Sequence, residues 1–95
     1  MKISGRFVNV FLLPNSVERS RFGFAVPKRL GNAVERNKMK RILREFSRKN
    51  DILKSLAIDL IYLVKLNFLK EDKFELNQSL VVLDKQIIKR LSTVC

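Results

Sequence analysis

The chain has 95 residues, a hydrophobic fraction of 46% and a formal net charge of +11. Its length predicts a single domain over residues 1–95, and its apolar content argues against disorder. The chain has no histidine and one cysteine, Cys95. This composition excludes an internal disulfide framework, a metal cage of His and Cys ligands, and the most common general base.

The first half of the chain contains two predicted strands. The stretch "RFVNVFLL", from Arg6 to Leu13, is rich in Val, Phe and Leu and predicts a strand that is largely buried on both faces. After a predicted turn at Pro14–Ser16, the stretch from Ser20 to Val26 predicts a second strand, antiparallel to the first. Pro27 ends it, because proline has no N–H to donate to a ladder.

A helix is predicted next, from Ala33 to Arg48, with Asn32 as its N-cap after Gly31. At 100° per residue, an apolar stripe spans about 100° of arc and should face the core. Its members are Met39, Ile42, Leu43 and Phe46. A second arc, about 140° wide, is almost entirely cationic and does not overlap the first.

The rest of the chain predicts one more strand and one more helix. Asp59–Lys65, "DLIYLVK", suits a strand covered on both faces, which could pair in parallel with an earlier strand through a crossover. Such crossovers are right-handed as a general rule. Leucine and isoleucine spacing then predicts a helix from about Glu71 to Leu91. The order β–β–α–β–α predicts an α+β fold, a two-layer α/β sandwich.

The cationic helix carries the strongest functional signal. From Lys28 to Arg48 the chain has eight Lys or Arg and two Glu, a net charge of +6. Arg36, Lys40, Arg44 and Arg48 form a ladder of like charges four residues apart, which weakens an isolated helix. A solvated face normally mixes both signs, so this face indicates binding to a polyanion.

The residue types on this face favour phosphate as the ligand. Arginine offers a rigid fork that matches phosphate oxygens, and lysine offers a mobile point charge. Asn37 adds a neutral donor and acceptor for a ribose hydroxyl or a base edge. Lys28 and Arg29 approach the same region from the end of the second strand. Catalysis finds no support, because the carboxylates are scattered and no histidine activates a serine.

The stretch "RFGFAVPKRLGNAVERNKMKRILREF" resembles the signature of the bacterial ribonuclease P protein component. That family carries an Arg, a basic strand end, G-N-A-V and then R-N-x-x-K-R-x-x-R. In this chain the matching positions are Arg21, Lys28, Arg29, Gly31 to Val34, Arg36, Asn37, Lys40, Arg41 and Arg44. The match fixes Gly, Asn, Ala and several cations in register, which a generic basic helix would not reproduce.

The resemblance implies a fold like domain 2 of ribosomal protein S5, with an unusual left-handed βαβ crossover. It also implies a family N-terminal helix of about twenty residues that is missing here, since this chain starts at the equivalent of the first strands. In the family, the sheet and that helix form a cleft for the leader strand of precursor tRNA. The resemblance places Val8 and Val10 in that cleft.

The resemblance further implies that the chain is the protein subunit of ribonuclease P, a cytoplasmic ribonucleoprotein endonuclease for tRNA processing. Its partners would be the catalytic RNA and precursor tRNA, with the protein present as a monomer. Hydrolytic removal of the 5′ leader would belong to the RNA and its Mg²⁺ ions, so the protein itself would have no catalytic residue and no metal ligand. The implied RNA-binding residues are Lys28, Arg29, Asn32, Arg36, Asn37, Lys40, Arg41, Arg44 and Arg48.

Two other hypotheses fit the composition. Another RNA-binding protein, such as a ribosomal protein, shares the charge and the α+β class. A peripheral membrane protein could use a basic amphipathic helix, but it would need apolar side chains free to insert into the bilayer. No stretch of the sequence approaches the ~18 apolar residues of a membrane span, and none has the pattern of a signal peptide.

Overall fold

The computed structural model describes residues 1–15 and 19–94, with side chains described as far as residue 91. The predicted turn at Pro14–Ser16 therefore lies partly outside the described residues, and Cys95 lies wholly outside them. In chain order the elements are β1 (Lys2–Ser4), β2 (Val8–Pro14), β3 (Arg21–Ala25), the 3₁₀ helix η1 (Lys28–Leu30), α1 (Ala33–Arg48), α2 (Asp51–Lys54), β4 (Ile58–Val64) and α3 (Lys73–Val94).

The described strands form one sheet in the order β1-β2-β4-β3. β1 and β4 both pair antiparallel with β2, whereas β3 pairs in parallel with β4. The parallel partner predicted for the strand near residue 60 is therefore confirmed. β2 and β3 run antiparallel as predicted, but they are not neighbours, because β4 lies between them and hydrogen bonds to both.

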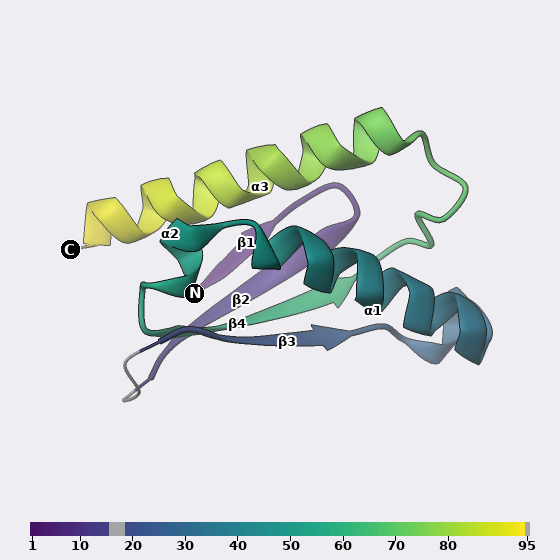
Figure 1. The fold of residues 1–95 in the computed structure, drawn as a ribbon, viewed down its shortest axis with the longest axis horizontal. Coiled ribbons are helices and arrows are strands. Elements are labelled where there is room, and N and C mark those ends of the chain that lie inside the picture. Colours follow the sequence, from purple (N-terminus) through teal and green to yellow (C-terminus); the bar gives the residue numbers. More distant parts are fainter. Residues whose placement is uncertain (16–18, 95) are drawn as a thin grey trace.

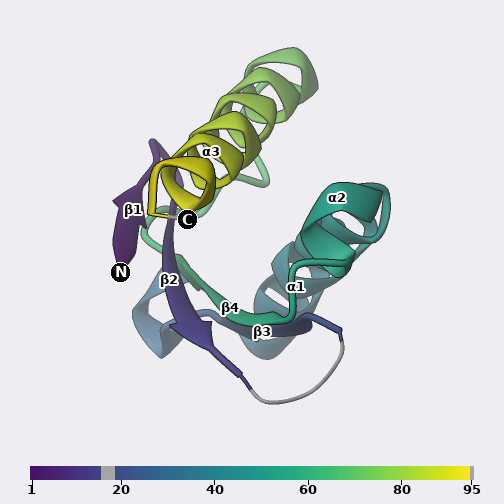
Figure 2. The same cartoon turned by 90° about the vertical axis from the view of Figure 1, so that its left-hand side faces the viewer.

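The connection from β3 through α1 to β4 crosses over one face of the sheet (Figure 1). In Figure 2 β3 runs away from the viewer, and the path from β3 through α1 to β4 turns counter-clockwise. The crossover is thus left-handed. The general right-handed rule fails here, and the handedness implied by the family resemblance is correct.

Both long helices cover the same face of the sheet and leave the other face open (Figure 2). Successive strand residues point to opposite faces, so alternate positions of β2 and β4 meet the helices. On the covered face, Val10, Leu60 and Tyr62 are at most 2% exposed. On the open face, Leu13 and Ile61 are 50% and 39% exposed. The layers match the predicted two-layer α+β sandwich.

The helices contribute the stripes that their spacing predicted. Met39 and Leu43 of α1 are fully buried, with Ile42 and Phe46 packed at the edge of the core. The α3 stripe consists of Leu76, Leu80, Leu83 and Ile87, all buried. Tyr62 of β4 stacks on Phe22 and Phe24 of β3, with ring centroids 6.4 and 5.4 Å apart. These contacts fix α1 above β3, with its opposite side toward solvent.

Candidate nucleic-acid interface

The start of α1 is held by a closed set of hydrogen bonds. The side-chain oxygen of Asn32 accepts from the Glu35 N–H at 2.8 Å, and Glu35 Oε1 accepts from the Asn32 N–H at 3.1 Å. This capping box satisfies two backbone donors that a helix start otherwise leaves open. Gly31 leaves room for it, because a Cβ there would lie 2.9 Å from Glu35 Oε1.

A third side chain ties this junction to the loop after β4. Asn67 Nδ2 donates to the Leu30 carbonyl at 2.9 Å and lies 3.4 Å from Glu35 Oε2. Glu35 is therefore engaged in fixing the geometry where η1 meets α1. Lys28 and Arg29, both exposed on η1, are held in a defined position just before the first turn of α1.

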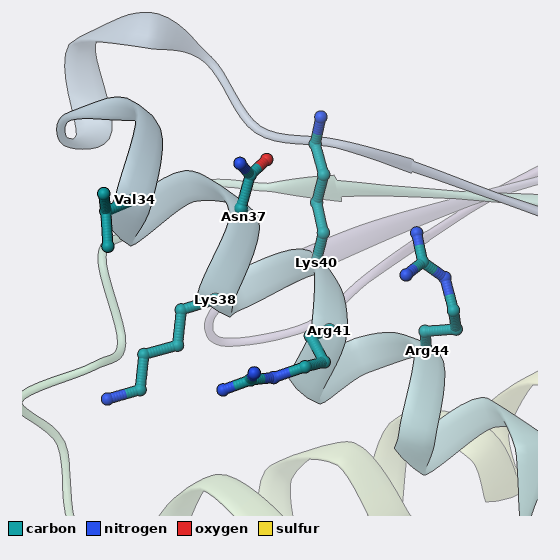
Figure 3. Close-up of a pocket in the computed structure, with 6 residues that line it drawn as sticks. All are labelled: Val34, Asn37, Lys38, Lys40, Arg41 and Arg44. Atoms are coloured by element: carbon teal, nitrogen blue, oxygen red, sulfur yellow. The ribbon is translucent and has the colours of Figure 1, made fainter.

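Six side chains of α1 surround a shallow hollow of about 470 Å³ on the solvent side of the helix (Figure 3). Its lining consists of Val34, Asn37, Lys38, Lys40, Arg41 and Arg44. Lys40 and Arg44 extend along one flank of the helix, and Lys38 and Arg41 along the other (Figure 3). We call this set the α1 groove. It offers two rows of cationic donors with the amide of Asn37 beside them.

No acidic side chain neutralises these cations within the described part of the chain. The ion pairs found there are Arg6–Glu75, Arg21–Asp59 and Lys54–Asp51, all away from α1. Arg44 instead lies with its guanidinium carbon 5.8 Å from the centroid of the Phe24 ring. Such a contact orients the group without removing its charge. The α1 groove is therefore a region of concentrated positive potential.

The other predicted RNA-binding residues lie around the groove rather than in it. Arg48 is exposed in the last turn of α1. Arg36 is half-buried, and its Nε atom is buried without a hydrogen-bond partner among the described residues. Asn32 is exposed, but its side-chain oxygen is committed to the cap.

Lys38 and Val34 were not predicted to belong to the site, although both line the groove. The signal for Lys38 was its position three residues before Arg41, which places the two side chains on one flank of a helix. Val34 is 75% exposed and gives the groove an apolar end.

The prediction that Val8 and Val10 line an accessible cleft is wrong. Both lie on the covered face of β2 and are 1% and 0% exposed. The alternation of β2 turns every second residue toward the helices, and these two valines fill the core there. A bound strand could reach them only by displacing α1 or α3.

Among the described residues, no group of three or more His, Cys, Asp or Glu side chains could hold a metal ion. Asp59 is held by Arg21 and Asn15, whose hydrogen bonds keep the pKa of its carboxyl below the usual value. Asp84 hydrogen bonds to Asn50, and burial raises its pKa. The carboxylates with shifted pKa values therefore have structural partners away from the α1 groove.

Comparison with known proteins agrees with the residues of this surface. A family model described as Ribonuclease P matches residues 1–88. The ribonuclease P protein component of Natranaerobius thermophilus is 42% identical over 60 residues, which cover 63% of this chain and 52% of that protein. That of Mycoplasma mycoides is 35% identical over 79 residues, covering 82% of this chain and 72% of that protein. The chain thus spans about half the length of the first of these relatives.

Solved structures share the fold. The RNase P protein of Staphylococcus aureus superposes with a TM-score of 0.78 at 29% identity, covering 92% of this chain and 80% of that one. The RNase P protein of Thermotoga maritima gives a TM-score of 0.74 at 25% identity, covering 87% and 81%. Since the family model covers most of the chain and the fold agrees, this chain belongs to the ribonuclease P protein family.

Proposed function

We propose that this chain acts as the protein subunit of a ribonuclease P and binds the catalytic RNA through the α1 groove, with Lys28 and Arg29 beside it. One observation carries the proposal: a member of this family presents a row of α1 cations with no acidic partner among the described residues. Arg36, Asn37, Arg48 and the side-chain amide of Asn32 extend the proposed contact along the helix and around its start.

The physical reason is the relief of like-charge repulsion. The cations of α1 repel one another in the free protein, and a ribose-phosphate backbone supplies the missing negative charge. Each phosphate contact releases condensed counterions, which makes the affinity strongly salt-dependent. The same positive potential would screen the repulsion between the catalytic RNA and precursor tRNA, the second proposed partner.

We assign the cleavage of the 5′ leader to the RNA subunit. The described carboxylates form no cluster suited to Mg²⁺, so the ions that such a reaction uses would be held by RNA phosphates. The residues of this chain would bind and orient RNA. We further propose that one copy works in each holoenzyme, in the cytoplasm.

Reconstitution tests the proposal directly. Precursor tRNA cleavage by a bacterial ribonuclease P RNA is measured at low Mg²⁺ with and without the chain. We expect the chain to raise the cleavage rate at low Mg²⁺ and to have little effect at high Mg²⁺, where free ions screen the phosphates. An unchanged rate, together with co-purification of the chain with ribosomal particles, would instead favour the ribosomal-protein hypothesis.

The packing of α1 counts against the membrane hypothesis. Met39 and Leu43, which a membrane-bound helix would need to insert, are buried in the core. Within the described residues, neither long helix has an apolar stretch sufficient to cross a bilayer.

A further inference from the structure

A second cationic surface lies at the far end of the sheet from α1. β1 forms the sheet edge beneath α3, whereas α1 packs on β3 at the other edge. Figure 2 shows β1 beside the C-terminal part of α3, on the opposite side of the molecule from α1. The hollow between them has a volume of about 470 Å³. It is lined by Lys2, Ile3, Ser4, Gln86, Lys89 and Arg90, and we call it the β1–α3 hollow.

Three of the six lining residues are cations, and none is acidic. Gln86, Lys89 and Arg90 are spaced three and four residues apart, which puts them on one side of α3. Lys89 and Arg90 near a helix C-terminus also complement the helix dipole. The dipole does not explain Lys2, however, which comes from a strand distant in the sequence.

The backbone of β1 adds donors to the same hollow. Met1 and Leu12 exchange hydrogen bonds, and Gly5 N–H donates to the Val8 carbonyl. In an antiparallel ladder the bonded residues alternate, so the N–H groups of Lys2 and Ser4 point away from β2, toward the free edge. The hollow therefore combines cationic side chains with main-chain donors, a combination that suits phosphate oxygens.

We propose that the β1–α3 hollow binds the phosphates of a second single-stranded RNA segment while the α1 groove holds another. The inference rests on the proposed function in taking RNA as the polyanion that the chain meets. A peptide adding a strand to β1 is the less suitable occupant. β1 has only three residues, and a lysine on a short edge strand opposes strand addition.

The test is a titration of the full-length, ¹⁵N-labelled chain with hexauridylate at low salt, followed by amide chemical shifts. We expect two separate groups of shifted amides, one along α1 and one at Lys2, Ser4, Gln86 and Arg90. Shifts confined to α1 and η1 would overturn the second site. The absence of shifts along α1 would count against the proposed function instead, so the two failures can be told apart.

Variants make the assignment specific. Lys2→Gln with Arg90→Gln should abolish the β1–α3 shifts and leave the α1 shifts and the melting temperature unchanged. It should also reduce the slope of log affinity against log salt for a longer single strand by about 1.4. The matched control, Arg19→Gln with Lys70→Gln, removes the same charges elsewhere and should leave both groups of shifts in place.

Two further results would contradict the inference. The β1–α3 shifts could persist undiminished in the Lys2→Gln, Arg90→Gln variant, in which case these cations do not form the site. Hexaglutamate could produce the same β1–α3 shifts at the same concentration as hexauridylate, in which case the hollow recognises acidic chains rather than RNA phosphates.

Discussion

The cations of α1 differ in what surrounds them. Arg41 is fully exposed in the groove, Arg44 lies against Phe24, and Arg36 is half-buried with an unpartnered Nε. From spacing alone these arginines looked equivalent, because a helical projection gives direction but not the depth of the neighbouring core. Loss of Arg36 would therefore combine a packing effect with a charge effect, whereas Lys40 and Arg41 report on charge more cleanly.

We expect Lys40→Ala with Arg41→Ala to weaken binding to ribonuclease P RNA and to reduce its salt slope by about 1.4 to 1.8, since two phosphate contacts are lost. Filter binding at several salt concentrations measures this slope. Arg19→Ala with Lys70→Ala is the charge-matched control. An equal reduction in the control would mean that only net charge matters.

Asp84 gives a prediction for pH. Burial raises the pKa of its carboxyl, despite the opposing hydrogen bond from Asn50 Nδ2 at 3.1 Å. The folded state thus holds this proton to higher pH than the unfolded state does. Its contribution to stability is present below about pH 4 and is lost as pH rises through the folded pKa. Ionised Asp84 is therefore destabilising at neutral pH.

Asp84→Asn should accordingly raise the melting temperature at pH 7 and change it little at pH 3, because its side-chain oxygen can still accept from Asn50. Thermal unfolding followed by circular dichroism at both pH values tests this expectation. Glu71→Gln, at an exposed position, serves as the control. A melting temperature at pH 7 below that of the parent chain would contradict it.

At the scale of elements, prediction worked where local signals were strong. α1 runs from Ala33 to Arg48 as expected, because Asn32 caps it and its apolar stripe is regular. β4 and α3 were displaced by only a few residues at their ends. β1, η1 and α2 were missed, since elements of three or four residues carry almost no periodicity. The pairing order was also beyond prediction, because the pattern of one strand does not specify its neighbour.

The cap of α1 can be tested by itself. Asn32→Ala removes one acceptor of the capping box and should destabilise the fold by about 1 kcal/mol. Gly31→Ala should destabilise it too, because its Cβ would meet Glu35 at 2.9 and 3.1 Å. Urea unfolding measures both. Asn77→Ala, at an exposed site within α3, should have little effect, and an equal loss there would contradict the assignment to the cap.

At the scale of the molecule, charge dominates. A net charge of +11 is accompanied by few ion pairs in the described part of the chain, all between exposed or partly exposed side chains. Such pairs contribute little, so self-repulsion should be felt by the whole fold. The site could be predicted from sequence for the same reason, since an excess of one sign is visible without coordinates. The burial of Val8 and Val10 could not, because it depends on which face of β2 the helices cover.

We therefore expect the melting temperature of the RNA-free chain to rise between 20 and about 200 mM NaCl, as screening lengths shorten to near 8 Å. Differential scanning calorimetry without RNA tests this expectation. A melting temperature that falls with added NaCl would mean that attractive pairs outweigh the repulsion.

The position of β4 has a consequence for how the chain is made. β4 joins β2 to β3, yet it follows both of them and α1 in the sequence. During synthesis, the first two-thirds of the polypeptide emerges as two pieces that have no shared hydrogen-bond ladder. The left-handed loop over the sheet can close only when residues 58–64 arrive, and closing contacts so distant in sequence is slow. Until then, α1 is an unanchored cationic segment, free to meet a nascent transcript before its own tertiary fold exists.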